Sequence, residues 1–86
     1  MTTITTDQLR DQNVIAELND KIAKKEIRMI KIRNNGDPII SLMASEYNTL
    51  VFQDKESFLC ISNENPYLHI LLWYNDFTKI QLNGVD

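Results

Sequence analysis

The side chains that could support catalysis or hold a metal ion are few in this chain. His69 is the only histidine and Cys60 the only cysteine among its 86 residues. A His/Cys metal site or a Cys–His nucleophile pair would therefore need these two residues together. Both lie in apolar runs, where a structural role is the commoner one. We expect Cys60 to be a small core residue and His69 to be a structural histidine.

The other candidates for chemistry are also weak. Asp54 and Glu56 lie in a polar turn, where carboxylates stay solvated and do not acquire the raised pKa of a general acid. Gly36 and Gly84 are the only glycines, and they are too far apart to form a glycine-rich phosphate loop. The sequence predicts no catalytic residue, no metal ligand and no cofactor. We therefore expect a binding protein that is not an enzyme.

Composition and the N-terminal residues indicate a small cytoplasmic protein. Hydrophobic residues make up 43% of the chain and charged residues 24%, as in an ordinary globular domain. The opening MTTITTDQLRDQ lacks the basic and apolar regions of a signal peptide, and the apolar run at residues 68–74 is too short to cross a membrane. A single cysteine fits a reducing compartment. We expect one domain, residues 1–86, without membrane association.

Charge is distributed unevenly along the chain. Residues 1–36 carry seven basic and five acidic side chains, a net charge of +2. Residues 37–86 carry two basic and seven acidic side chains, a net charge of −5. This split fits a basic surface for an anionic partner and an acidic surface for a second partner, but it also fits two ordinary solvated faces.

The first predicted long element is a helix that begins near Thr5. Thr5 and Gln8 have the spacing of a capping box, and Ile4 and Leu9 that of a hydrophobic staple. A short strand around Ile4 precedes the helix, and the lysines at 24–25 end it. Apolar residues at helical spacing predict its buried face: Val14, Ile15, Leu18 and Ile22.

A strand and a hairpin follow the helix. Alternation of side chains with period two predicts a strand over residues 26–33. Asn35-Gly36 then lies between two apolar runs, and both residues tolerate the positive φ of a type I′ turn. With this two-residue loop, Ile32 would face Ile39 on the second strand. Pro38 suits the edge of a sheet.

The rest of the chain predicts further strands, with one ambiguous segment. Residues 45–58 are compatible either with a helix or with two strands joined at Asp54-Lys55, because periodicity cannot separate short apolar runs. Residues 63–66 form a turn, and residues 67–74 and 77–82 are rich in strand-forming types. The predicted fold class is α+β, in which an N-terminal helix packs on an antiparallel sheet.

Two segments, MTTITTDQLRDQN at the N-terminus and RNNGDPIISLMASEYNTL at residues 33–50, resemble the N-terminal half of the Phd/YefM family of type II antitoxins. The resemblance implies a homodimeric autorepressor whose Arg10 and Arg33 contact operator DNA, and we predict Lys31 as a third DNA-binding residue. It also implies a helix opening at Glu46-Tyr47 and an acidic C-terminal half that caps a toxin. The chain departs from the family at Leu9, where a small residue is usual, and in the strand-like residues 57–83. The matching positions are Ile4, Arg10, Arg33, Asn35, Gly36, Leu42 or Met43, Glu46, Tyr47 and Leu50.

Two functions are favoured on this basis, and a small subunit of a larger assembly is a third possibility that the sequence does not distinguish from them. The first is an antitoxin-like protein that binds and neutralises a toxin and also binds DNA. The alternative is an inhibitor of the immunity or phage anti-defence type, which binds a target such as a defence enzyme and no DNA; the overall net charge of −3 favours it. For both, the predicted partner-binding residues are aromatic side chains around one turn, which would otherwise be ordinary sheet core: Tyr67, Trp73, Tyr74 and Phe77.

Overall fold

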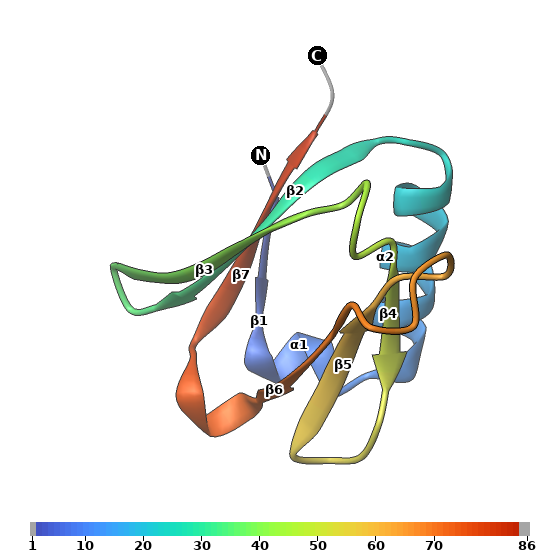
Figure 1. Ribbon diagram of the computed structural model, residues 1–86. Coiled ribbons are helices and arrows are strands. Elements are labelled where there is room, and N and C mark those ends of the chain that lie inside the picture. Colours follow the sequence, from blue (N-terminus) through green and yellow to red (C-terminus); the bar gives the residue numbers. More distant parts are fainter. Residues whose placement is uncertain (1, 85–86) are drawn as a thin grey trace.

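The computed structural model describes residues 2–84 of the chain. Figure 1 shows the arrangement of its strands and helices. In chain order they are β1 (Thr2–Thr5), α1 (Thr6–Leu9), α2 (Gln12–Ala23), β2 (Ile27–Asn34), β3 (Asp37–Met43), β4 (Thr49–Phe52), β5 (Ser57–Ile61), β6 (His69–Trp73), the 3-10 helix η1 (Tyr74–Asp76) and β7 (Lys79–Gly84).

The strands form two antiparallel sheets. Sheet A has the strand order β1-β7-β2-β3, and sheet B has the order β4-β5-β6. Helix α2 lies beside sheet B, and both sheets and α2 contribute to one core (Figure 1). The prediction of one antiparallel sheet covered by an N-terminal helix is wrong. Strands account for 47% of the described residues and helices for 23%, and the strands divide between two sheets.

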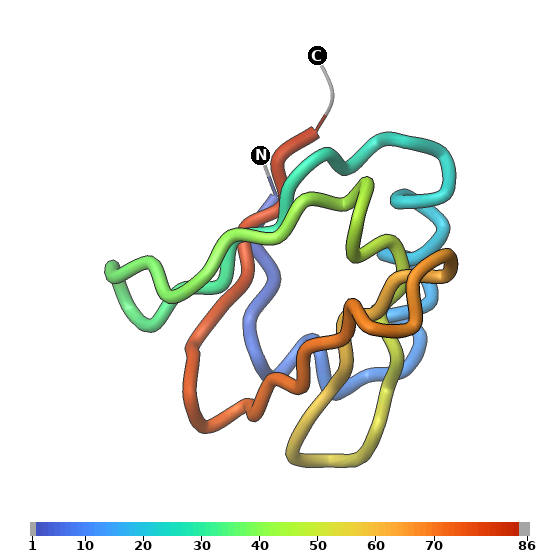
Figure 2. Tube along the Cα trace, in the orientation of Figure 1, coloured from blue at the N-terminus to red at the C-terminus, as the bar shows by residue number. Residues whose placement is uncertain are grey.

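The division into two sheets arises at a tight turn after β3. The N–H groups of Glu46 and Tyr47 both donate to the carbonyl of Met43, at 3.0 and 2.9 Å. This turn takes the chain out of sheet A, as the green part of the trace in Figure 2 shows, and β4 then pairs in sheet B. The helix that the family resemblance implies at Glu46-Tyr47 is therefore not formed. Of the two possibilities for residues 45–58, the two-strand interpretation is confirmed.

The N-terminal helical region forms as two helices. Thr5 caps α1 through the predicted capping box with Gln8. Asp11 then acts as a second N-cap, since its side chain accepts a hydrogen bond from the N–H of Asn13 at 2.9 Å, and α2 begins after it. The predicted stripe lies on the core side of α2, with Ile15, Leu18 and Ile22 buried and Val14 half-buried. Within residues 2–84, no helix combines the length and apolar character needed to span a membrane.

Helix α2 ends in a left-handed residue that is not glycine. The N–H of Lys25 donates to the carbonyl of Ile22, and that of Glu26 donates to the carbonyl of Lys21. These two bonds form a Schellman motif, in which Lys25 takes the position with positive φ, here 62°. Glycine is the usual residue at this position because a Cβ atom is strained there.

Replacing Lys25 with glycine is therefore expected to stabilise the protein by about 0.5–1 kcal/mol. The neighbouring Lys24 has φ −81°, which any residue adopts. Lys24→Gly should accordingly destabilise the protein by a similar amount, because it adds freedom to the unfolded chain and removes the exposed ion pair of Lys24 with Asp20. Urea unfolding of both variants measures the difference, and equal effects from the two substitutions would contradict a strained Lys25.

The loop of the hairpin lies where the sequence predicts it, but its geometry differs. Asn34 pairs with Asp37, so Asn35 and Gly36 form the two-residue loop between β2 and β3. Only Asn35 has a positive φ, of 55°, and Gly36 does not. The loop is consequently not the type I′ turn, which requires positive φ at both residues.

The predicted pairing of the hairpin is wrong by one residue. Ile32 pairs with Ile40 and not with Ile39, because a bulge lies between Ile32 and Arg33. A bulge places one extra residue on one strand and so shifts every pair beyond it. A second irregularity lies between Ile27 and Met29, where β2 pairs with β7. It allows Ile27 to be buried together with Ile30 and Ile32.

An aromatic cluster joins the C-terminal part of the chain to α1. The Phe58 and Tyr74 rings stack with centroids 5.8 Å apart, and Phe77 meets Phe58 edge-on at 5.9 Å. The hydroxyl of Tyr74 donates to the carbonyl of Leu9 at 3.1 Å. Because η1 turns the chain between β6 and β7, Tyr74 and Phe77 both enter the core, each only 3% exposed.

Candidate protein-binding surface

Sheet B has an inner face that packs on the core and an outer face that does not. Successive side chains of a strand point to opposite faces. On β5, Phe58 and Cys60 are buried in the core, so Leu59 and Ile61 lie on the outer face. Cross-strand pairing then fixes the outer-face residues of β4 and β6.

The outer face of sheet B is apolar across the middle of all three strands, with the polar residues Thr49, Ser57 and His69 at its ends. Leu59 of the central strand pairs with Val51 on one side and with Leu71 on the other. Trp73 and Ile61 continue the apolar surface toward its two ends. Leu71 is 37% exposed and Trp73 44% exposed. We call these five residues the apolar face: Val51, Leu59, Ile61, Leu71 and Trp73.

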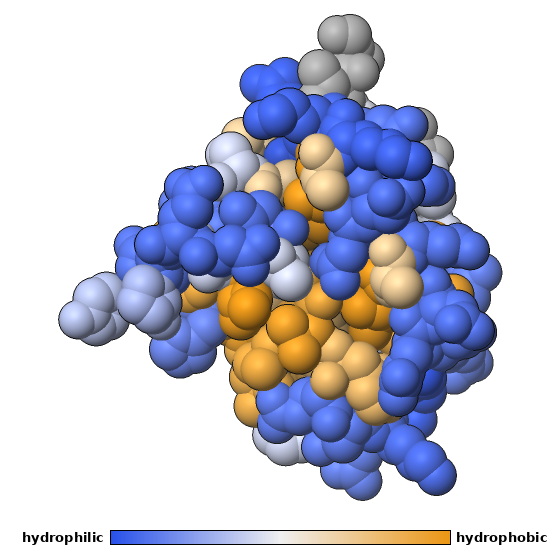
Figure 3. Space-filling model, turned by 90° about the vertical axis from the view of Figure 1, so that its right-hand side faces the viewer, coloured by the Kyte–Doolittle hydropathy of each residue, from blue (hydrophilic) through white to orange (hydrophobic). Residues whose placement is uncertain are grey.

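Charged side chains are absent from the strands of sheet B. The sequences TLVF, SFLCI and HILLW contain no Asp, Glu, Lys or Arg. Figure 3 shows a continuous hydrophobic area at the height of β4 and β5, with hydrophilic residues around it. Exposed apolar patches with a polar rim are typical of protein-interaction sites. The apolar face can therefore bind an apolar surface of another protein without removing a charge of its own from water.

Two polar side chains hold sheet B in place. Asn19 on α2 donates from its amide to the carbonyl of Leu50 at 2.7 Å and accepts from the N–H of Leu50 at 2.6 Å. Asp54 accepts from the N–H groups of Glu56 and Ser57 in the β4–β5 turn, at 2.7 and 2.9 Å. The hydrogen bond from the N–H of Glu56 has the largest effect and lowers the pKa of the Asp54 carboxyl. The hydrogen bonds from Ser57 lower this pKa further, by smaller amounts. The apolar face is thus presented by a sheet with an anchored edge and an ordered turn.

The predicted partner-binding aromatics divide between the surface and the core. Tyr67 is 88% exposed in the loop before β6, and Trp73 belongs to the apolar face. Tyr74 and Phe77 lie in the core, where they cannot contact a partner of the folded protein. Sequence reasoning missed four residues of the apolar face, Val51, Leu59, Ile61 and Leu71. Their signal is the apolar character of both alternating faces in three successive strands, which carry no charge.

The predicted DNA-binding residues also divide. Lys31 and Arg33 lie together on the outer face of sheet A, where Arg33 donates to the side chain of Gln81 at 2.6 Å. Lys79 was not among the predicted residues, yet it lies directly opposite Arg33 on β7. Arg10 lies elsewhere, with its guanidinium carbon 5.0 Å from the centre of the Tyr74 ring. Across residues 2–84 the one ion pair joins Lys24 to Asp20. Within these residues, the three cations on the outer face of sheet A therefore have no carboxylate partner: Lys31, Arg33 and Lys79.

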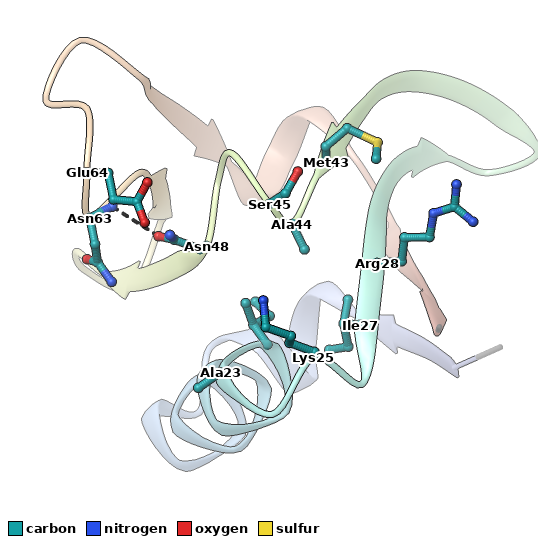
Figure 4. A pocket seen from close by; sticks show the side chains of 11 residues that line it. Ala23, Lys25, Ile27, Arg28, Met43, Ala44, Ser45, Asn48, Asn63 and Glu64 are labelled. Carbon is teal, nitrogen blue, oxygen red and sulfur yellow. Dashed lines mark hydrogen bonds between the residues drawn. The ribbon is translucent and has the colours of Figure 1, made fainter. Parts of the chain in front are cut away.

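A cleft of about 520 Å³ opens between the end of α2, the strands β2 and β3, and the loop after β5. Figure 4 shows Lys25 directed into it, Asn63 bonded through its N–H to Asn48, and Arg28 directed away. The volume is that of a small-ligand pocket. Its lining offers no histidine, cysteine or aspartate for chemistry: Ile22, Ala23, Lys25, Ile27, Arg28, Met43, Ala44, Ser45, Asn48, Asn63 and Glu64.

The structure places Cys60 and His69, the only cysteine and the only histidine of the chain, in different environments. Cys60 is fully buried, as predicted, and burial raises the pKa of its thiol to about 12. A thiol in this state is a poor nucleophile because the thiolate is the reactive form. His69 is exposed on β6, and its Nδ1 lies 3.4 Å from the carbonyl of Pro66. Among residues 2–84 no cluster of three metal-ligating side chains occurs.

Alkaline pH is expected to destabilise the protein through Cys60. The folded state raises the thiol pKa from 9.0 to about 12, so stability is unaffected below pH 9 and falls as the pH rises from there. Burial also raises the pKa of Tyr74, which acts in the same direction. Between about pH 8 and about pH 10.5 we expect a loss of about 1–2 kcal/mol from Cys60. Urea unfolding under reducing conditions measures it, and Cys60→Ala should lose less over this range than the natural chain.

No protein-family model matches this sequence, and no curated protein or solved structure does so either.

Proposed function

We propose that this protein binds another protein through the apolar face and thereby neutralises it, as an antitoxin or an immunity-type inhibitor does. The supporting observation is the uncharged outer side of sheet B, with Leu71 and Trp73 exposed at its edge. Trp is enriched among the residues that dominate binding energy. Burial of apolar area contributes roughly 25 cal/mol per Å², so covering this face supplies a favourable term that requires no charge pairing.

Leu59 is the best position at which to test the proposal. It lies in the central strand, between Val51 and Leu71, and its side chain is half-buried on the outer face. A lysine there can lay its methylene chain along the sheet and place its ammonium group in the middle of the apolar face. A partner would have to bury that charge, which costs several kcal/mol.

The experiment compares Leu59→Lys with a matched control. The tagged natural chain is purified from the organism that encodes it, and the protein that co-elutes is identified and titrated against both variants. Leu59→Lys should weaken binding at least about 100-fold, or about 2.7 kcal/mol. Ile39→Lys, at an exposed residue of β3 in sheet A, should bind as the natural chain does. Equal affinities for the two variants, or no partner at all, would overturn the proposal.

A second candidate function is binding of nucleic acid through the outer face of sheet A. It is supported by Lys31, Arg33 and Lys79, which lie on that face without a carboxylate partner in the described residues. Like charges in directly opposed positions, as at Arg33 and Lys79, destabilise a sheet. A row of phosphates would relieve this repulsion. The neighbouring Gln81, Asn83 and Ser41 add hydrogen-bonding groups.

Fluorescence anisotropy with duplex DNA from upstream of the gene tests this second function. We expect binding at low salt. With three phosphate contacts, a plot of log K against log salt concentration should have a slope no steeper than about −3. Lys79→Gln should weaken binding and reduce the slope by about 1. Lys24→Gln is the control, because Lys24 is the C-cap residue of α2 and pairs with Asp20. Absence of binding at low salt would exclude this function.

A further inference from the structure

The edges of the two sheets differ in how they are protected against pairing with another strand. Natural proteins block sheet edges with short strands, proline, charge, bulges or a covering helix. On β3, Asp37, Pro38 and the bulge at Ile39 serve this purpose. β1 is only four residues long. The edge of β4 lies against α2, where Asn19 occupies both backbone groups of Leu50.

Across the described residues 2–84, strand β6 has no bulge, no proline, no charged residue and no paired strand at its outer edge. It pairs with β5 alone, and its sequence HILLW contains no charged residue and no proline. A backbone hydrogen bond lies just beyond each end of the β5–β6 pairing. The N–H of Ser62 donates to the carbonyl of Leu68 at one end, and the N–H of Tyr74 donates to the carbonyl of Glu56 at the other. In an antiparallel ladder the bonded pairs alternate, so Ile70 and Leu72 bond to β5. The N–H and C=O groups of His69, Leu71 and Trp73 therefore point to the free edge.

We propose that a second copy of this chain pairs with β6 at that edge, antiparallel and centred on Leu71. In this register Leu71 pairs with Leu71 of the second copy, and His69 pairs with Trp73 of the second copy. The three outward-pointing residues of each copy would form six backbone hydrogen bonds in all. This proposal concerns the edge of sheet B, whereas the proposed function concerns its face.

A second copy fits this edge because the strand is self-complementary. The outer-face residues of β6 run aromatic, leucine, aromatic, so the order is the same in both directions. The antiparallel pairing places Leu71 beside its own copy and each Trp73 ring beside an imidazole, and it opposes no charges. Aromatic cross-strand pairs contribute roughly 0.2–1 kcal/mol each. An unrelated strand could make the backbone bonds, but it would not match this sequence by symmetry.

The dimer would extend the apolar face. The two-fold axis at Leu71 is perpendicular to the sheet, so both copies present their outer faces on the same side. The result is a six-stranded sheet in which the two apolar faces are continuous. Any partner protein that covers the face would then contact residues of both copies, and dimerisation would increase the area available to it.

Sedimentation equilibrium and amide hydrogen exchange test the dimer. The natural chain should dimerise in a concentration-dependent way. Above the dissociation constant, the amides of His69, Leu71 and Trp73 should exchange at least about 100-fold more slowly than below it. The amides of Ile70 and Leu72 should be protected at both concentrations. A natural chain that stays monomeric at about 1 mM, or outward amides whose exchange ignores concentration, would overturn the proposal.

Two variants separate the edge from the face. Leu71→Pro removes a donor that does not bond to β5, and proline is tolerated in an edge strand at such positions. It should abolish dimerisation while the circular dichroism spectrum stays unchanged. Leu59→Lys should stay dimeric, although it loses the partner protein. Dimers in a folded Leu71→Pro would contradict the edge pairing alone, whereas retained partner binding by Leu59→Lys would contradict the proposed function alone. If Leu71→Pro does not fold, Leu71→Lys replaces it.

Discussion

The Phe58→Ala variant is expected to lose a large part of the protein's free energy of unfolding. Phe58 is fully buried in the central strand of sheet B and contacts the rings of both Tyr74 and Phe77. Truncating a buried phenylalanine to alanine costs about 3–5 kcal/mol. A chain of this length has a free energy of unfolding of about 4–13 kcal/mol in total. The loss should be especially large here because the cavity would separate β5 from η1.

Urea unfolding followed by circular dichroism measures this effect. Tyr67→Ala provides the control, because Tyr67 is also aromatic but 88% exposed, and its removal should change stability by less than about 0.5 kcal/mol. Phe58→Leu should fall between the two. A Phe58→Ala variant within about 1 kcal/mol of the natural chain would show that the three rings do not hold the C-terminal segment in place.

Replacing Asn19 with alanine should produce the next largest loss. The Asn19 side chain satisfies both the N–H and the C=O of Leu50 in a partly buried position. Without it, both backbone groups lose their partner, at a cost of about 1–3 kcal/mol for each buried group that water cannot reach. Because these bonds are only partly buried, the lower half of that range applies to each group. Alanine favours the helix by about 0.5 kcal/mol, so the expected net loss is about 1.5–3.5 kcal/mol.

Asn13→Ala is the matched control for Asn19→Ala. Asn13 is also on α2, but it is exposed, and only its backbone N–H is bonded, to Asp11. Its replacement should be neutral or slightly stabilising. Hydrogen exchange of the Leu50 amide adds a local readout: it should accelerate in Asn19→Ala and stay unchanged in Asn13→Ala. A stability loss without that local acceleration would argue against the role assigned to Asn19.

The features that sequence predicts well are those determined by local interactions. The Thr5–Gln8 capping box, the buried stripe of α2 and the position of the Asn35-Gly36 loop each depend on residues within a few positions of one another. The C-terminal strands on either side of Asn75-Asp76 are also where sequence places them.

The errors arise where distant contacts decide the structure. The bulge after Ile32 cannot be recognised in the local sequence, because the pairing with the bulge and the pairing without it both bury apolar residues. The separation of sheet A from sheet B depends on the turn at Met43–Tyr47, and short apolar runs did not distinguish this turn from a helix start. For the same reason, the sequence could not divide the aromatic residues near β6 into exposed Trp73 and buried Tyr74. That division needs the 3-10 turn of η1.

The position of β7 bears on how this protein can be made in the cell. β7 lies between β1 and β2 in sheet A. Residues 79–84 are thus the neighbour to which both of these N-terminal strands bond. During synthesis, β1 has no neighbour in its sheet until these residues have left the ribosome. Pairings between such distant segments also form slowly. The apolar strands of sheet B are thus synthesised before sheet A can close, and the incomplete fold is exposed to aggregation and to proteases until residues 79–84 have left the ribosome.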